Sequence, residues 1–130
     1  MKEIKYRGKR VDNGEWVEGH FFETVEGIRR CYNIVVNREV KFYVRYDTIG
    51  QFIGLKDKKG KEIFEGDIIK SDSHSNPSEF AIEFIEGGFC ATHPTINDNP
   101  IDINHFYPSI GCTIEVIGNK FDNPELLKEV

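Results

Sequence analysis

Two cysteines and two histidines in the C-terminal half of the chain are the side chains best suited to hold a metal ion or to attack a substrate. Cys90 and His93 have the spacing of a tight ligand pair, whereas His105 and Cys112 are separated by six residues that include a proline and a glycine. A structural zinc site needs four convergent ligands, usually in two tight pairs. These four residues are therefore weak zinc candidates, and we expect no metal and no cofactor.

The same residues raise the hypothesis of a thiol nucleophile, which needs a base at hydrogen-bond distance and an oxyanion-donating turn that is not recognisable here. A second group of titratable residues, Glu62, Glu65 and Asp67, is the densest acidic cluster in the central motif described below. Carboxylates without a histidine or a further acid are typical of a solvated surface. The chain also lacks a phosphate loop, a dinucleotide fingerprint and a hydrolase elbow. We expect no enzymatic activity, and a metal or thiol enzyme is the second alternative.

Basic and aromatic residues are interleaved between positions 29 and 45, a pattern typical of single-strand nucleic-acid binding, in which cations follow phosphates and aromatic rings stack on bases. The candidate binding residues are Arg29, Arg30, Arg38, Lys41, Tyr43 and Arg45. Phe42 and Tyr46 lie on the apolar side of the same alternation, so we expect them in the core. Nucleic-acid binding through this face is the first alternative function, disfavoured because the rest of the chain would repel a polyanion.

The net charge of −5 conceals a strong polarity along the chain. Residues 29–61 carry nine basic and three acidic side chains, whereas residues 62–130 carry three basic and thirteen acidic ones. Opposite charges favour head-to-tail association of copies, unless the two halves intermix in one copy and cancel. The preferred partner is therefore a second copy of the chain. The candidates for a buried contact are Phe21, Phe22, Phe106 and Tyr107, which alternatively fill the core of a single copy.

Short apolar clusters separated by glycines predict an antiparallel meander over residues 1–45, with its clearest turn at Asp12-Asn13-Gly14. Residues 40–46 alternate most regularly and predict a half-buried strand with a basic outer face. Residues 46–130 predict five or six further strands, which suit an SH3-like barrel. The expected fold is all-β, with the meander extending or capping the barrel in one cooperative unit.

Residues 49–70 predict a hairpin through Asp57-Lys58-Lys59-Gly60, followed by a turn at Glu65-Gly66-Asp67. A second hairpin is expected over residues 80–91, a last strand over 113–117 and a short helical turn from Asn123-Pro124-Glu125. Residues 71–79 and 93–104 are expected to be loops, and their ordering on binding is left open.

No apolar run exceeds three residues, so we expect no membrane segment and a cytosolic protein. The three cysteines are odd in number and widely spaced, which favours reduced, buried thiols over disulfides.

Three segments together resemble the YopX family of phage and prophage proteins. They are IKYRGKRVDNGEWVEGHF near the start, IGQFIGLKDKKGKEIFEGDIIK in the middle and EVIGNKFDNPELL near the end. The resemblance implies a β-rich fold with an SH3-like barrel, assembly into oligomers, a bacterial host cell and a phage or host protein as a further partner. It implies no established activity.

The motif residues are interpreted as architectural, because glycines serve turns and close approaches while the accompanying apolar side chains pack strands. Residues with an expected structural role are Gly8, Gly14, Trp16, Gly54, Asp57, Gly60, Gly66, Asp67, Gly118, Asn123 and Pro124. A role specific to this chain is expected in the segments between the motifs, residues 23–47 and 71–111.

Overall fold

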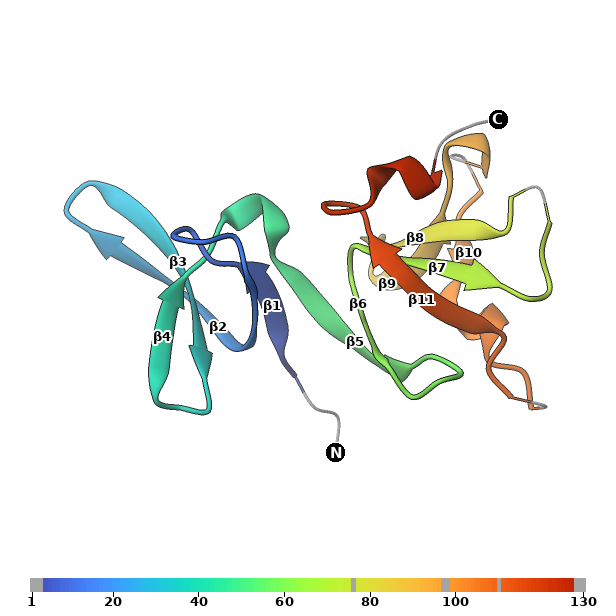
Figure 1. Ribbon diagram of the computed structural model, residues 1–130, viewed down its shortest axis with the longest axis horizontal. Helices are drawn as coiled ribbons and strands as arrows, with labels where there is room; N and C mark the ends of the chain where they lie inside the picture. Colours follow the sequence, from blue (N-terminus) through green and yellow to red (C-terminus); the bar gives the residue numbers. More distant parts are fainter. Residues whose placement is uncertain (1–3, 76, 97–98, 110, 128–130) are drawn as a thin grey trace. The chain divides into compact units, whose positions relative to one another are not determined.

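The computed structural model describes residues 4–75, 77–96, 99–109 and 111–127. The described residues form antiparallel strands joined by turns, and their helical segments are short 3-10 turns (Figure 1). No helix in these ranges has the length and apolar character needed to cross a bilayer. The chain divides into two compact units, residues 1–54 and 55–130, whereas the sequence pattern placed the division after residue 45.

The N-terminal unit is a meander, as predicted. Its strands are β1 (Tyr6–Lys9), β2 (Trp16–Glu26), β3 (Arg29–Val36), β4 (Val40–Tyr43) and β5 (Gly50–Lys56), with a 3-10 turn, η1, at Tyr46–Thr48. The sheet order is β4-β3-β2-β1-β5-β6, where β6 is Glu62–Phe64, and the boundary between the units falls within β5. The chain reverses at Gly14 and Gly27, which both have positive φ, and at Asn37 and Arg38, which adopt φ of 54° and 62°.

The strand predicted over residues 40–46 ends at Tyr43. Val44 is buried, but Tyr46 begins η1 and leaves 65% of its surface exposed, so its assignment to the core was wrong. Its ring instead packs against Tyr32 with centroids 4.6 Å apart. The alternation of apolar residues thus continues in the sequence beyond the point where the strand ends.

The second unit contains β6 (Glu62–Phe64), β7 (Asp67–Ser71), β8 (Glu79–Ile85), β9 (Gly88–Thr92), β10 (Ile101–Asp102) and β11 (Ile114–Asn119). The last five form a sheet of order β10-β9-β8-β7-β11 whose neighbours are all antiparallel. Three 3-10 turns complete the unit: η2 (Pro94–Ile96), η3 (Ile103–Phe106) and η4 (Pro124–Leu127).

Both predicted hairpins are confirmed. Gly60 and Gly66 close the turns around β6 with φ of 84° and 94°, and Glu86 and Gly87 connect β8 to β9. The predicted loop over 93–104 was wrong in part, because it contains η2, β10 and the start of η3. The described residues form strands and short 3-10 turns, so the all-β fold is confirmed. Neither sheet closes on itself in the described ranges, so the closed SH3-like barrel is not confirmed.

Buried apolar side chains are unequally divided between the units. Those of the first are Ile34, Val44, Phe52 and Ile53. Those of the second are Ile63, Phe64, Ile68, Ile69, Phe80, Ala81, Ile82, Ala91, Ile103, Phe106, Ile114 and Val116. Phe106 is therefore part of a core rather than of the predicted association surface.

Candidate functional site

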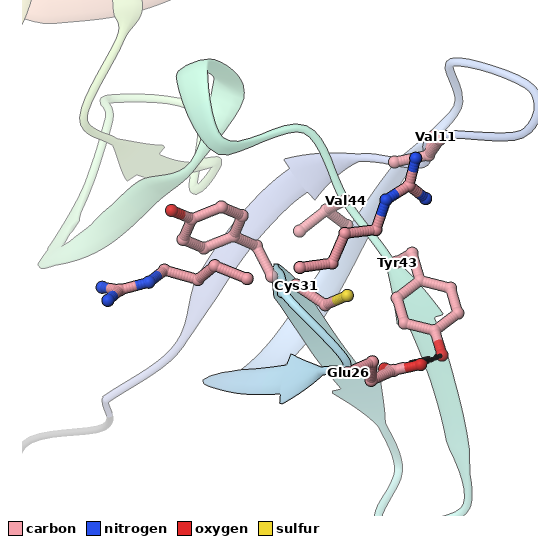
Figure 2. Close-up of a pocket in the computed structure, with 8 residues that line it drawn as sticks. Val11, Glu26, Cys31, Tyr43 and Val44 are labelled. Carbon is pink, nitrogen blue, oxygen red and sulfur yellow. Dashed lines mark hydrogen bonds between the residues drawn. The ribbon is translucent and has the colours of Figure 1, made fainter.

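A cavity of about 460 Å³ opens on the N-terminal unit beside the end of the β2–β3 hairpin (Figure 2). It is lined by Val11, Glu26, Arg29, Arg30, Cys31, Tyr32, Tyr43 and Val44. Apolar and aromatic side chains thus lie beside the guanidinium group of Arg29, whereas Arg30 contributes to the lining from the opposite side of β3. Such a lining suits an apolar group that carries a negative charge beside it.

The tyrosine in this cavity is held by a carboxylate. The Tyr43 hydroxyl donates to the two oxygens of Glu26, at 3.1 and 3.0 Å (Figure 2). Lys41 Nζ lies 4.7 Å from the centroid of the Tyr43 ring, as a cation over its face. These contacts fix the ring as part of the cavity wall, so Tyr43 is not a freely available platform for a base.

The apolar end of the β2–β3 hairpin is the feature that sequence reasoning missed. Val25 is 70% exposed and Ile28 is fully exposed on either side of Gly27. Large apolar side chains at such a position cover nothing in their own unit. The signal was an isoleucine directly after a turn glycine, where polar residues are usual.

The predicted binding residues all lie in the N-terminal unit but do not form one face. Arg29 lies opposite Glu26 in the β2–β3 pair, and its side chain is on the same face of the sheet as Tyr43. Arg30 is the next residue of β3, so its side chain is on the other face. Arg30 lies 3.4 Å from Glu23, and Arg45 lies 3.2 Å from Asp47.

Two cations of the predicted set differ from the others. Arg29 and Arg38 have no ion pair and no hydrogen-bond partner among the described residues. Arg29 lines the cavity of Figure 2, and Arg38 occupies the turn between β3 and β4. The structure therefore separates the predicted basic face into carboxylate-paired residues and two available guanidinium groups.

The cysteine and histidine candidates of the second unit lie in separate surroundings. The Cys90 thiol donates weakly to the Gly88 carbonyl at 3.8 Å, and its burial raises the pKa of the thiol. Cys112 contacts the carbonyl of Ile114 at 3.7 Å. All three cysteines are free thiols and half-buried rather than fully buried.

The two histidines are equally separate. His93 is buried and its Nδ1 lies 2.9 Å from the Thr95 hydroxyl, whereas the ring of His105 packs against Phe106. In the described ranges no three His, Cys, Asp or Glu residues are grouped so as to hold a metal ion.

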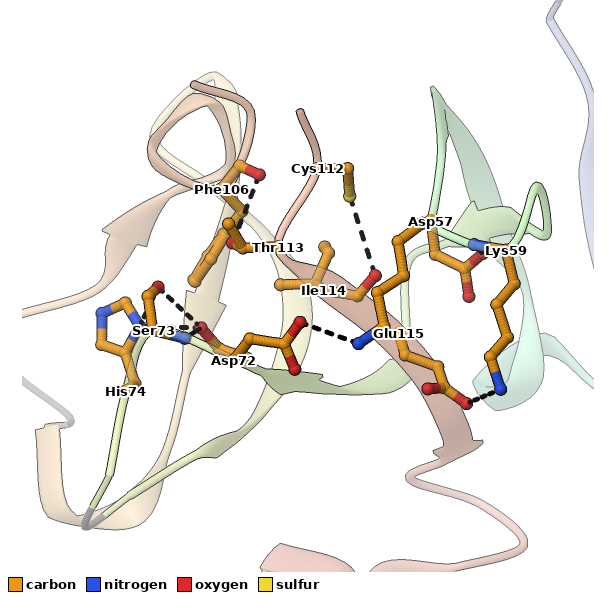
Figure 3. Close-up of polar contacts among 12 residues, drawn as sticks. Asp57, Lys59, Asp72, Ser73, His74, Phe106, Cys112, Thr113, Ile114 and Glu115 are labelled. Carbon is orange, nitrogen blue, oxygen red and sulfur yellow. Dashed lines mark hydrogen bonds and ion pairs between the residues drawn. The ribbon is translucent and has the colours of Figure 1, made fainter. Parts of the chain in front are cut away.

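His74 joins His105 in an aromatic cluster that the sequence did not indicate. Its ring centroid lies 5.3 to 5.5 Å from those of Phe80, His105 and Phe106. Its Nδ1 lies 2.8 Å from the Ser71 hydroxyl (Figure 3). Burial, and secondarily His105, lower the pKa of His74. The cluster attaches residues after β7 to the core. Between Ser71, which ends β7, and Glu79, which begins β8, the described residues contain no strand, in agreement with the predicted loop.

Asp57 connects the hairpin turn between β5 and β6 to the last strand (Figure 3). One carboxylate oxygen accepts from the backbone N–H groups of Lys59 and Lys61, and the other accepts from Val116 N–H at 2.9 Å. Burial by itself would raise the pKa of Asp57, but these hydrogen bonds outweigh it and hold the pKa below its ordinary value. This carboxylate is an architectural group.

A model of the YopX protein family matches residues 5–128. The chain belongs to the YopX family. A crystal structure of protein EF1440 from Enterococcus faecalis is similar, with a TM-score of 0.58 and 26% sequence identity over 98% of this chain and 100% of that chain. No curated protein matches.

The YopX motif residues occupy structural positions. Asp67 is buried and accepts from Phe64 N–H at 2.8 Å. A Cβ on Gly118 would lie 2.6 Å from Asn123 Oδ1, so only glycine allows the segment before η4 to pack on β11. Trp16 receives the guanidinium of Arg7 over its ring at 4.7 Å.

The remaining motif positions are turns, a close approach and a helix start. Gly8 faces Val44, whose Cβ would be 3.1 Å from an added Cβ. Gly14 and Gly54 have positive φ, and Pro124 opens η4. The three YopX motifs thus describe the scaffold, whereas the cavity of Figure 2 lies mainly in the segment 23–47, between the first two motifs.

Proposed function

We propose that this YopX protein is a binding and assembly module without catalytic activity, and that copies of it associate head to tail. The phage or prophage origin, the bacterial cytoplasm and an SH3-like arrangement of the second unit, which the family resemblance implies, belong to the same proposal. One observation carries it: large apolar side chains are exposed almost entirely in one unit.

Seven of the eight large, exposed apolar side chains of the described residues belong to the N-terminal unit. They are Ile4, Val11, Val25, Ile28, Val40, Tyr43 and Tyr46. The eighth is Phe84, on β8 of the second unit. An apolar surface of this kind marks a contact with another macromolecule.

The charge of the two units favours a second copy as the partner. The N-terminal unit contains ten basic and eight acidic residues, a net of +2, and the second unit contains seven and fourteen, a net of −7. Phe84 is 52% exposed, its ring packs on that of Phe89 with centroids 5.1 Å apart, and Glu86 lies in the turn of the β8–β9 hairpin. An aromatic ring near a carboxylate is the complement of the aromatic cavity beside Arg29.

The proposed contact therefore inserts Phe84 of one copy into the cavity of the next, with Glu86 facing Arg29. This contact joins two different surfaces, so repeated copies form a ring or a filament. Because charge pairs surround an apolar centre, association weakens as salt rises but is not abolished by moderate salt.

The test is multi-angle light scattering on the purified chain across protein concentration and salt. Phe84→Ser is expected to reduce the assembled mass to that of a single chain. Ile4→Ser, which removes an apolar side chain that is 64% exposed and lies outside the contact, is expected to leave the mass unchanged. Arg29→Glu and Glu86→Arg should each weaken assembly, and the double variant should restore it. A single-chain mass at every salt and concentration overturns self-association. An assembled mass that is the same in all these variants overturns the proposed contact.

A further inference from the structure

A second cavity of the N-terminal unit has a volume of about 630 Å³ and differs from the first in the charge of the side chains that line it. Its residues are Ile4, Lys5, Gly19, His20, Phe22, Val35, Asn37 and Arg38. Three of these side chains are basic and none is acidic, whereas the first cavity includes Glu26. The volume is that of a small-molecule site.

Strand register explains how the basic groups come together. His20 lies directly opposite Val35 in the β2–β3 pair, so the two side chains share a face. Tyr6 lies opposite Gly19 in the β1–β2 pair, which places Lys5 beside His20 in the adjacent row. Arg38 reaches the same hollow from the turn that follows β3.

The turn holds Arg38 in a conformation that most residues avoid. Asn37 and Arg38 both have positive φ, and Glu39 N–H donates to the Val36 carbonyl at 3.1 Å. Residues other than glycine accept the left-handed region at an energetic cost, and such conformations gather at functional sites. The turn fixes where the Arg38 side chain leaves the backbone.

Two of the three basic groups are available to a ligand, because Arg38 and His20 have no ion pair or hydrogen-bond partner among the described residues. Lys5 is engaged: its Nζ lies 3.9 Å from the exposed carboxylate of Glu18 and 5.3 Å from the centroid of the Phe52 ring. A solvated ion pair of this length contributes little stability, and the charge of Lys5 adds to the attraction for an anion. A phosphate group, which accepts hydrogen bonds from several cationic donors at once, is the anion that such a set recognises best.

The rest of the lining is apolar. Ile4, Phe22 and Val35 provide aliphatic and aromatic surface against which a planar ring can pack. The Asn37 side chain adds an amide that can both donate and accept. We infer that this cavity binds a mononucleotide, with its phosphate among Lys5, His20 and Arg38 and its base on the apolar residues. This site is separate from the proposed assembly contact.

The experiment is calorimetric titration of the full chain with adenosine 5′-monophosphate, adenosine, inorganic phosphate and a ten-nucleotide oligothymidylate. Arg38→Asn removes the guanidinium while asparagine tolerates the left-handed turn, and Arg29→Asn is the matched control in the other cavity. His20→Gln is a second variant that leaves the turn untouched. The midpoint of unfolding by Trp16 fluorescence confirms that each variant is folded.

We expect the monophosphate to bind, and adenosine and inorganic phosphate each to bind at least about tenfold more weakly, the loss of one charge-assisted interaction or more. Arg38→Asn and His20→Gln should each lower the affinity for the monophosphate, and Arg29→Asn should change that affinity by less than about twofold. Absence of monophosphate binding overturns the inference. So does equal weakening by Arg38→Asn and Arg29→Asn, which indicates general charge attraction, and so does binding of the oligonucleotide alone.

Discussion

The two units of this chain arrange apolar residues in opposite ways. Twelve of the sixteen buried apolar side chains of the described residues lie in the second unit, and seven of the eight large exposed ones lie in the first. The second unit therefore obtains its stability from its own core. The first presents apolar surface that its own residues leave uncovered, and this surface is the basis of the proposed contact with a second copy.

The division also separates scaffold from working surface. Asp57, Asp67 and Gly118, which belong to the YopX motifs, act through backbone hydrogen bonds and close packing. The first cavity is lined mainly by residues outside those motifs, whereas half of the lining of the second, Ile4, Lys5, Gly19 and His20, belongs to the first motif.

The largest expected effect comes from truncating the core of the second unit. Phe106 is fully buried and packs against Phe80 and His74. Phe106→Ala should lower the free energy of unfolding by about 3–5 kcal/mol. Urea unfolding followed by hydrogen exchange of second-unit peptides measures it, with Trp16 fluorescence reporting the first unit.

That variant also tests how independent the units are. If Trp16 fluorescence keeps its midpoint while the second unit is destabilised, the two regions unfold separately. A common shift of both signals indicates one cooperative unit. A loss below about 1 kcal/mol would contradict the assignment of Phe106 to a tightly packed core.

Asp57 gives a smaller effect with a characteristic dependence on pH. Asp57→Asn replaces an acceptor oxygen with a donor facing backbone N–H groups, and should cost about 2 kcal/mol. The folded-state pKa of Asp57 lies below its ordinary value near 3.8, so its stabilising contribution is present above that pH. The contribution is lost as pH falls through the folded pKa.

Acid unfolding of the second unit is the measurement. The original chain should lose stability below about pH 4, and Asp57→Asn should lose less over the same range because it has no carboxylate to protonate. If the free energy of unfolding falls equally with pH in the two chains below about pH 4, Asp57 contributes nothing to acid sensitivity.

The smallest effect on stability is expected at the apolar end of the hairpin. Ile28 is fully exposed, so Ile28→Ser should change the free energy of unfolding by less than about 0.5 kcal/mol. The same variant should reduce assembly measured by light scattering, because Ile28 adjoins Arg29 of the proposed contact. A substantial loss of stability would show that Ile28 packs within its own unit and would remove the contrast with Phe106.

Local turn chemistry made much of the fold predictable. The hairpins at Gly60 and Gly87, the turn at Gly66 and the helical turn at Pro124 follow from residues that are close in sequence. The family could be recognised from the same local motifs. Tyr46 was misplaced because an alternating pattern carries no signal for where hydrogen bonding stops.

The candidate sites were only partly predictable. That Arg29 and Arg30 face opposite sides of β3 follows from the pleat and could have been anticipated. The contact of His74 with His105 and the meeting of Lys5 with Arg38 in one cavity depend on strand order and on residues distant in sequence. No local pattern contains that information.

The order of strands has a consequence for protein synthesis. Every sheet partner of β1 to β4 has left the ribosome once β5 has emerged, whereas β7 lacks its neighbour β11, and Asp57 lacks Val116, until the chain is nearly finished. At about 5–20 residues per second, several seconds separate the two events. If the units fold separately, the N-terminal unit of a growing chain folds, with Ile28 exposed, before its own second unit has been synthesised. Under the proposed self-association, a completed copy made from the same message can bind it at that stage.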